Sequence, residues 1–381
     1  MELSAKTNIV GLIHEDSCES LWMKGIPISV PDIRGYPMEA ETVCDASWPQ
    51  EAHFLQHVFE MDDNGAGEPA YNGFPDKDDD RPGTGADMRE LSDSIIDFMK
   101  IDAGSQPFPV SEEGMSLLRR NSPLVMYNTR QEQHFHLEMM QAFQTLGYEA
   151  YRLVPGIGCL APIQADNSDI CDLNLYFCKS DRANRLSANA FLIRQNIDIT
   201  VGVRTDPHLW VESLQRYPYV IQMARLWAQF IVMNGNDILW RMHQEALCSY
   251  AVSRMTQLPP EDRFQALYWA YLLLEDILRE KATFSRLMSL ARVSSDLGYR
   301  ERTFSVVKRL LQMLDSRDEV SVNEPFLAIS EHFEALDPGL EIGNWCLHSF
   351  MEAHERYRTH SWGFAGVATA SADLQPPPIA L

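Results

Sequence analysis

Apolar runs of strand length alternate with helix-like segments between Ser94 and Leu153. The runs Ile95–Ile101 and Leu124–Tyr127 suit strands that are buried on both faces, and helical patterns cover 111–120 and the stretch that stops at Gly147. An order of strand, helix, strand, helix, strand indicates right-handed crossovers and a parallel sheet covered on both faces. This stretch therefore predicts half of a doubly wound, partly Rossmann-like α/β domain.

The pattern changes to short extended runs after Leu153. A Pro155-Gly156 turn and an acidic turn separate the runs that end at Val154, Ile163 and Cys178. Such turns favour antiparallel strands, and we expect these strands to complete the edge of a mixed sheet. At the other end of the chain, Asn8–Ile13 and Gly25–Val30 predict short strands, and residues 1–60 could cover the exposed edge of the parallel sheet, which otherwise invites dimerisation.

From about Asp206 the period becomes helical and stays so to Leu314. Asp206-Pro207 predicts a helix start, and a second helix follows Pro260, a third is capped by Thr283 and a fourth comes after Gly298. The last two resemble one tetratricopeptide hairpin, with a small residue where the helices cross. The apolar stripes that we expect to be buried are Val220, Ala224, Trp227 and Ile231, then Leu267, Tyr271, Leu274 and Leu278, then Phe304, Val307, Leu311 and Leu314.

Composition shifts divide the chain into six predicted parts. Gly, Pro and Asp concentrate in one internal stretch, which is typical of a linker. The parts are a mixed α/β segment at 1–60, the linker at 61–90, a half-Rossmann domain with antiparallel strands at 91–204, a tetratricopeptide-like helical extension at 205–316, a docking segment at 317–365 and a disordered tail at 366–381.

The charge balance limits the classes of partner. Asp and Glu outnumber Lys and Arg by 54 to 32, which gives a net charge of −22 and disfavours nucleic acids and anionic membranes. Seven cysteines without a repeated spacing indicate reduced thiols, and no leader peptide or membrane-spanning run is evident. We therefore expect a cytoplasmic protein whose partner is another protein or a second copy of itself.

A polar cluster follows the two predicted parallel strands and forms the candidate pocket. It consists of Asp102, Asn128, Arg130, His134 and His136. The carboxyl ends of the strands are where α/β sheets bind ligands. The two histidines can chelate one metal ion only if the following helix begins after them, because residues two apart lie on opposite sides of a helix. A solvated loop without a ligand is the alternative interpretation of this cluster.

Two other groups have metal-ligating side chains. His53 and His57 stand four residues apart in a predicted helix over 50–59, and Cys159, Cys171 and Cys178 fall among the antiparallel strands. The alternative interpretations are a helix that rests its imidazoles on the core edge, and buried thiols that pack as small apolar groups. No third ligand accompanies the histidine pair, so the sequence predicts no metal site.

Several motifs in order resemble one family. IDFMKIDAGSQ, SPLVMYN, LGYEAYRLVPGIGCLAPI, DLNLYFCKSDRA and NEPFLAISEHFEALDPG together look like the C-terminal two thirds of long FkbM-type methyltransferases that carry a helical extension. The resemblance covers roughly residues 88–365. It implies a Rossmann-like fold, S-adenosylmethionine as cofactor and methyl transfer to a hydroxyl group.

The chain departs from this family at the cofactor half and at the strand ends. Only the 61–90 linker stands where such enzymes have a first strand, a glycine-rich turn and an acidic residue for the ribose, and a βαβ unit needs about 30 residues or more. The chain keeps Lys100–Asp102 of the family's Lys-Ile-Asp-x-Glu-Gly pattern, but Gly104 and Ser105 replace its Glu and Gly. Asn128 stands where a Glu is usual after the next strand.

These departures predict a degenerate, non-catalytic methyltransferase relative that acts as a protein-binding or accessory partner and binds no cofactor. Two alternatives stay open. One is an active S-adenosylmethionine-dependent O-methyltransferase whose site is completed by another chain, and the other is a metal-dependent modifying factor.

Overall fold

The computed structural model describes most of the chain beyond Ser94 and one short strand before it. The described residues are 9–12, 97–102, 112–128, 133–163, 174–194, 206–315, 321–339 and 341–358. They form two compact units, a sheet unit within 9–194 and a helical unit over 206–358, which also includes the turn Val154–Ile157. Each unit is described below by itself.

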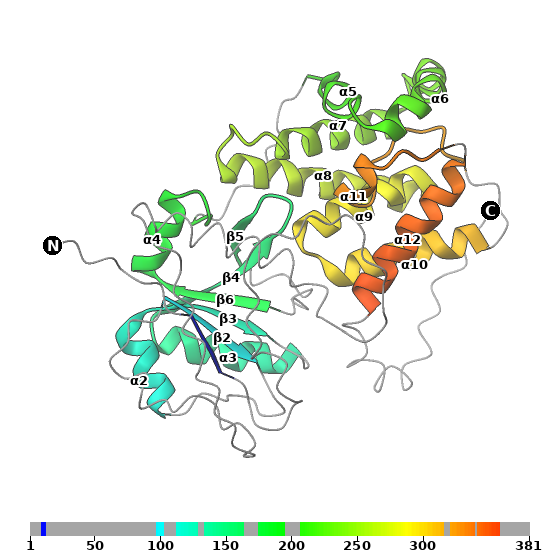
Figure 1. Ribbon diagram of the computed structural model, residues 1–381. Coiled ribbons are helices and arrows are strands. Elements are labelled where there is room, and N and C mark those ends of the chain that lie inside the picture. Colours follow the sequence, from blue (N-terminus) through cyan, green and yellow to red (C-terminus); the bar gives the residue numbers. More distant parts are fainter. Residues whose placement is uncertain are drawn as a thin grey trace. The chain divides into compact units, whose positions relative to one another are not determined.

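The sheet unit is built on one mixed sheet (Figure 1). Its strands are β1 (Ile9–Leu12), β2 (Phe98–Asp102), β3 (Leu124–Asn128), β4 (Tyr148–Val154), β5 (Cys159–Pro162) and β6 (Asn174–Lys179), in the order β1-β2-β3-β6-β4-β5. β1, β2 and β3 pair in parallel, and β6 pairs antiparallel with both β3 and β4. β4 therefore runs in the same direction as β2 and β3.

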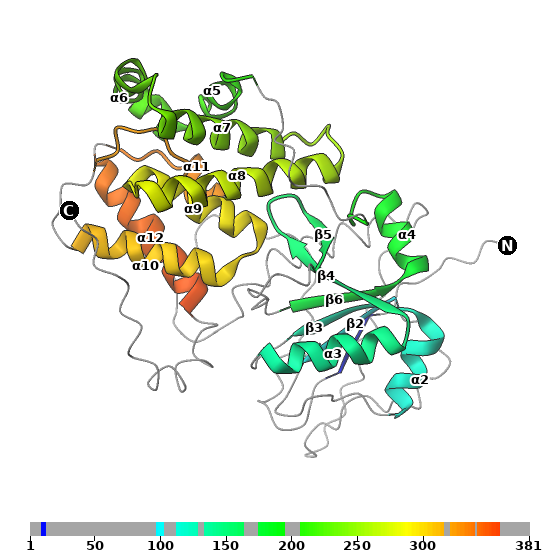
Figure 2. The ribbon, with the colours of Figure 1, turned by 180° about the vertical axis from the view of Figure 1, so that it is seen from behind.

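Helices cover both faces of this sheet. α2 (Glu112–Asn121) joins β2 to β3 and α3 (Gln133–Thr145) joins β3 to β4, and both lie on one face, as Figures 1 and 2 show from opposite sides. α4 (Ser180–Ala188) follows β6 and packs its buried Ala183 and Leu186 against the other face. Alternate residues of each strand point to opposite faces, so the continuous apolar runs supply both cores.

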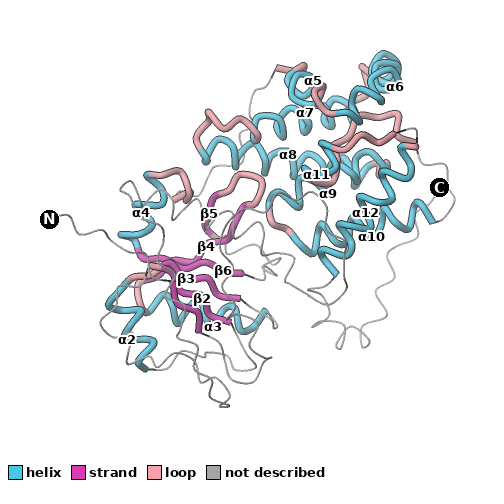
Figure 3. The backbone as a smooth tube through the Cα atoms, in the orientation of Figure 1, coloured by secondary structure: helices cyan, strands magenta, loops and turns pink. Residues whose placement is uncertain are grey.

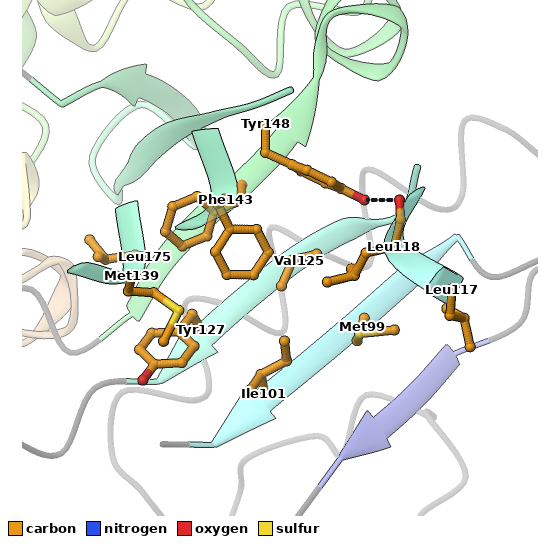
Figure 4. Packing of buried hydrophobic residues seen from close by; sticks show 11 residues of the cluster. Met99, Ile101, Leu117, Leu118, Val125, Tyr127, Met139, Phe143, Tyr148 and Leu175 are labelled. Carbon is orange, nitrogen blue, oxygen red and sulfur yellow. Dashed lines mark hydrogen bonds between the residues drawn. The ribbon is translucent and has the colours of Figure 1, made fainter. Parts of the chain in front are cut away.

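The core under α2 and α3 is closed by aromatic side chains (Figure 4). Phe143 of α3 stacks on Phe177 of β6 with ring centroids 4.2 Å apart. Tyr148 donates a hydrogen bond of 2.9 Å from its hydroxyl to the carbonyl oxygen of Leu118 in α2. Burial raises the pKa of this phenol, so the hydroxyl keeps its proton and acts as a donor. The bond ties the start of β4 to α2.

The strands and helices predicted between Ser94 and Cys178 are confirmed within a few residues. The N-terminal strand is also confirmed, and it pairs with β2, so that the edge of the parallel sheet is covered by the chain itself. One expectation was wrong, because β6 lies between β3 and β4 rather than at the edge. Its run Asn174–Phe177 is buried on both faces, which fits an interior strand better than an edge strand.

The helical unit consists of helices, of which α7 to α10 pack in chain order (Figure 3). They are α5 (Leu209–Leu214), α6 (Pro218–Asn234), α7 (Ile238–Ser253), α8 (Pro260–Glu280), α9 (Phe284–Leu297), α10 (Arg300–Asp315), α11 (Glu331–Ala335) and α12 (Ile342–Arg358). α7 packs on α8, α8 on α9, α9 on α10 and α10 on α12. The likeness of α9 and α10 to a tetratricopeptide hairpin stays a prediction.

The predicted ends of α9 are confirmed. The Thr283 hydroxyl accepts a bond of 3.3 Å from the backbone N–H of Arg286, as an N-cap does. Gly298 ends the helix with φ of +84°, a left-handed conformation that glycine adopts without strain. The predicted start at Asp206-Pro207 is less accurate, because α5 begins at Leu209 and the Asp206 carboxylate instead accepts a bond from the N–H of His208.

The predicted stripe of α6 was partly wrong. Tyr219, Val220, Met223 and Trp227 are buried, whereas Ala224 is exposed. α6 is apolar around most of its circumference, so the spacing of apolar residues did not decide which face is buried. In α10 the buried residues are Thr303, Val306, Val307 and Leu310. The expected stripe there contains one of these and three half-buried residues.

None of the described helices combines the length and apolar character that a membrane-spanning segment needs. The predicted strand at Gly25–Val30, the predicted helix over 50–59, the linker at 61–90 and the tail at 366–381 lie outside the described residues.

Truncating the core of the helical unit should destabilise it. Trp227 and Leu274 are buried, and Trp227 also donates to the carbonyl oxygen of Val322 at 3.1 Å. Trp227→Ala and Leu274→Ala should each lower the free energy of unfolding by about 2–5 kcal/mol, measured by urea denaturation. Val232→Ala, on the exposed side of α6, is the control and should change it by less than about 0.5 kcal/mol. Unchanged stability in both core variants would contradict this packing.

Candidate functional site

The structure brings two of the predicted pocket residues together. Asp102 and Asn128 are the last residues of β2 and β3, and they are partners in the register of these parallel strands. Both therefore stand at the carboxyl edge of the sheet, where the sequence placed the candidate pocket. Arg130 lies outside the described residues.

The two histidines of the predicted pocket do not meet the condition for chelation. α3 begins at Gln133, so His134 and His136 both belong to the helix. Residues two apart lie on opposite sides of a helix, and the pair cannot bind one metal ion together. The structure thus excludes the one geometry in which the pair could chelate.

The described cysteines are buried and form no disulfide bond with one another. They are Cys159, Cys178, Cys248 and Cys346. Burial raises the pKa of the Cys178 and Cys346 thiols to about 12, so both stay protonated and act as small apolar groups. The described part of the chain contains no cluster of three metal-ligating side chains. Cys171, His53 and His57 lie outside it.

An extended segment runs through the interior of the helical unit. This segment, Ser321–Ser330, has the sequence SVNEPFLAIS and is here called the strap. It forms no regular secondary structure, yet residues 324–329 are all buried (Figure 3). A buried backbone must find hydrogen-bond partners, and the strap has no neighbouring strand to provide them.

Helix side chains supply these partners. Tyr219 contacts the strap twice, since its hydroxyl accepts from the N–H of Ala328 at 3.3 Å and donates to the carbonyl oxygen of Phe326 at 3.4 Å. Ser285 donates to the carbonyl oxygen of Glu324 at 2.8 Å, and Ser289 accepts from the N–H of Leu327 at 3.2 Å. The strap is therefore bound by side chains much as a peptide ligand is bound in a groove.

Glu324 is the polar anchor of the strap. Its carboxylate accepts from Nε of Arg286 at 2.8 Å and from the Thr283 hydroxyl at 2.8 Å, and it lies 3.0 Å from Nδ1 of His243. Burial alone would raise its pKa. The hydrogen bond and charge of His243, the charge of Arg286 and the hydrogen bond of Thr283 outweigh burial and lower the pKa to about 2. Glu324 is thus held as a carboxylate.

His243, Ser289 and Glu324 form an arrangement that resembles a catalytic triad. Nε2 of His243 lies 3.3 Å from the Ser289 hydroxyl, and its Nδ1 faces the Glu324 carboxylate. In a serine hydrolase the histidine takes the proton of the serine through one ring nitrogen and is oriented by a carboxylate at the other. The sequence analysis singled out none of these three residues.

The surroundings of Ser289 do not suit hydrolysis. Its side chain is completely buried in the middle of α9, so a substrate carbonyl cannot approach the hydroxyl oxygen. That hydroxyl also donates to the carbonyl oxygen of Ser285 at 3.1 Å while it accepts from Leu327. Arg286 compensates the charge of Glu324 and reduces its ability to stabilise an imidazolium. The geometry fits the binding of the strap rather than acyl transfer.

A second buried charge cluster lies at the other end of the strap. Arg292 is almost completely buried and donates to the Asp296 carboxylate at 2.8 Å and to the carbonyl oxygen of Ala328 at 3.4 Å. Its guanidinium lies 3.3 Å from the Glu334 carboxylate, and Tyr250 donates to Asp296 at 3.0 Å. Burial raises the pKa of Glu334, and the charge of Arg292 acts against this rise.

Part of this network left a signal in the sequence. Half of the residues of α9 are polar, among them Ser285, Arg286, Ser289 and Arg292, and polar residues inside a buried helix need partners. A lone Glu324 before an apolar run is a second such signal. Neither signal identifies the partner, since Glu324 and His243 are far apart in the chain.

No family model, no curated protein and no solved structure matches this chain.

Replacing Glu324 by Gln should destabilise the protein at neutral pH. A fall in pKa from 4.5 to about 2 corresponds to about 3 kcal/mol of stability. For a carboxyl with a lowered pKa, this stability is present above pH 4.5 and is lost as the pH falls towards 2. The difference in unfolding free energy between wild type and Glu324→Gln should therefore shrink over this window, as urea denaturation at a series of pH values can measure.

Glu280→Gln provides the matched control for this experiment. Glu280 is an exposed carboxylate at the end of α8, and its substitution should change stability by less than about 0.5 kcal/mol at any pH. A Glu324→Gln variant as stable as this control would show that the strap does not depend on the carboxylate.

The triad-like arrangement can be tested by chemical labelling. Because the Ser289 hydroxyl is buried and hydrogen-bonded, the folded protein should not react with a fluorophosphonate probe of serine hydrolases. In-gel fluorescence and mass spectrometry measure the labelling, and Ser289→Ala is the control. Labelling of the wild type that disappears in Ser289→Ala would contradict the structural role.

Proposed function

We propose that this chain is a non-catalytic relative of FkbM-type methyltransferases that acts as a protein-binding or accessory partner. It binds no S-adenosylmethionine by itself. The observation that supports the proposal is the register of the parallel strands, in which Asp102 and Asn128 are partners at the carboxyl ends of β2 and β3.

The arrangement of the sheet unit supports the family relationship. Three strands that run in the same direction, β2, β3 and β4, are joined in order by α2 and α3 on one face. Parallel strands with helical crossovers are the elements of a doubly wound domain. The segments whose sequences resemble the family, around β2, β3, β4 and β6, are those that form this sheet.

The sequence at the strand ends supports the loss of catalysis. Asn128 stands at the end of β3 where the family has a Glu, and Gly104 and Ser105 follow β2 in place of Glu and Gly. An uncharged amide neither accepts a proton at neutral pH nor orients a cation as a carboxylate does. The linker at 61–90 is also too short for a complete βαβαβ half that would bind a nucleotide.

A protein-binding role is supported by the helical unit. Its helices α7 to α10 pack in chain order, as helices do in repeat proteins that recognise other proteins through their surfaces. It also exposes large apolar side chains, among them Ile221, Val232 and Met233. Exposed apolar residues that cluster on one element mark an interaction surface.

Calorimetric titration tests the absence of cofactor binding. The purified chain should give no binding heat with S-adenosylmethionine or S-adenosylhomocysteine at micromolar affinity. Its thermal unfolding should also stay unshifted, because a ligand that binds only the folded state raises the unfolding temperature. A cooperative melt without ligand is the control that the sample is folded.

The active enzyme is the alternative outcome of this titration. Micromolar binding by the chain alone would contradict the non-catalytic proposal and favour a methyltransferase. Binding that requires a co-purifying protein would instead indicate a cofactor site shared between two chains.

A further inference from the structure

Helix α6 exposes large apolar side chains on the side opposite its buried face. Its inner face packs into an aromatic cluster in which Trp227 lies 5.4 Å from Phe326 of the strap and Tyr219 lies 5.4 Å from Trp345 of α12, measured between ring centroids. Its outer face is exposed, and α6 lies at the periphery of the helical unit in both views (Figures 1 and 2). Exposed large apolar residues that cluster on one element mark an interaction surface.

The outer face carries exposed large and small apolar residues, together with the polar Gln222, Arg225 and Gln229. Val232 is 85% exposed, Met233 77% and Ile221 66%, and Ile238 at the start of α7 is 64% exposed. Ala224 and Ala228 lie between the larger residues and are also exposed. Small residues in the middle of a helix face let a second helix approach closely, while large ones at both ends fill the space beside it.

This face is also free of negative charge, although the chain as a whole carries −22. Residues 213–236 contain no Asp or Glu, and Arg225 is the only charged residue of α6. The centres of protein interfaces are depleted of charge in the same way. Two strongly acidic copies of the chain repel one another, and such an acid-free surface is where they can come into contact.

Charged residues at the two ends of α6 are complementary to each other. Arg216 stands just before the helix and Asp237 just after it, and both are exposed. If two α6 helices lie side by side in opposite directions, the Arg216 end of each helix adjoins the Asp237 end of the other. Antiparallel helices also have favourable dipole interactions.

We propose that α6 is the contact surface of a homodimer in which two copies pair antiparallel about a twofold axis. The axis passes near the middle of α6, so that Ile221 of each copy faces Val232 of the other and Arg216 faces Asp237. A twofold interface requires a self-complementary surface, and these two pairings are each made twice. Arg225 lies near the axis, and its long side chain extends past Ala228 to solvent.

The charge pattern favours a second copy over an acidic helix from another protein. An acidic partner would match Arg216 and Arg225 but would place like charge beside Asp237. A second copy matches both ends at once. The contact is small, because it is made by one helix of 17 residues, which is about 25 Å long. Typical protein interfaces are larger and bury about 800 Å² per partner. The dissociation constant should therefore lie in the micromolar range.

This inference rests on the protein-binding part of the proposed function and not on the lack of cofactor binding. The dimer proposal and the proposed lack of cofactor binding are tested by separate experiments, since the oligomeric state is measured without S-adenosylmethionine.

Sedimentation velocity of the full chain over a wide range of protein concentrations tests the proposal. The wild type should shift from monomer to dimer as the concentration rises. Val232→Asp places a carboxylate opposite Ile221 at both ends of the contact and should weaken the dimer at least about tenfold. Met351→Asp is the matched control, because Met351 is 54% exposed on α12, and this variant should dimerise like the wild type.

Disulfide cross-linking tests the antiparallel arrangement. The double variant Ile221→Cys with Val232→Cys should form covalent dimers under mild oxidation. In the proposed dimer, the thiol at position 221 of one copy faces the thiol at position 232 of the other. The two single variants should form few. The added thiols within one chain are too far apart along α6 to pair with each other.

Three results would overturn the proposal. They are a wild type that stays monomeric at every concentration, a dimer that Val232→Asp leaves intact, and a dimer that Val232→Asp and Met351→Asp weaken equally. Thermal unfolding of each variant confirms that a lost dimer does not reflect a lost fold. A dimer that is selectively lost in Val232→Asp and that is captured by the double cysteine variant supports it.

Discussion

The helical unit depends on the requirement that a buried backbone be hydrogen-bonded. The strap passes through its interior without a strand beside it, so each buried N–H and C=O group that lacked a partner would cost about 1–3 kcal/mol. Tyr219, Ser285 and Ser289 provide such partners from α6 and α9. The positions of the helices and of the strap therefore depend on each other, because the buried polar groups of each are hydrogen-bonded by the other.

Buried charges at both ends of the strap also determine its position. Glu324 is compensated by Arg286, and Arg292 is compensated by Asp296 and Glu334. Buried ion pairs contribute little net stability compared with apolar residues of similar size, but removing one partner is costly. Their physical effect is to exclude other positions of the strap, because a shift along the groove would leave a charge buried without its partner.

The sequence predicted what local patterns determine. The apolar runs at β2 and β3, the cap at Thr283 and the stop at Gly298 depend on neighbouring residues, and these predictions hold. The position of β6 inside the sheet depends on pairing with distant strands, so the turn pattern could not give it. The same limit applies to the contact of His243 with Glu324, which joins separate elements. Of the predicted pocket, Asp102 and Asn128 are brought together by the register of β2 and β3, which one crossover joins.

The strap also determines which face of α6 remains outside. Tyr219 and Trp227 contact strap atoms through both hydrogen bonds and ring packing, and this fixes the rotation of α6 about its axis. Ile221 and Val232 then have to lie on the exposed side, although they are as apolar as the residues that are buried. Without the strap, the apolar composition of α6 would allow several rotations with similar burial. The outer surface of this unit is therefore a consequence of polar contacts made in its interior.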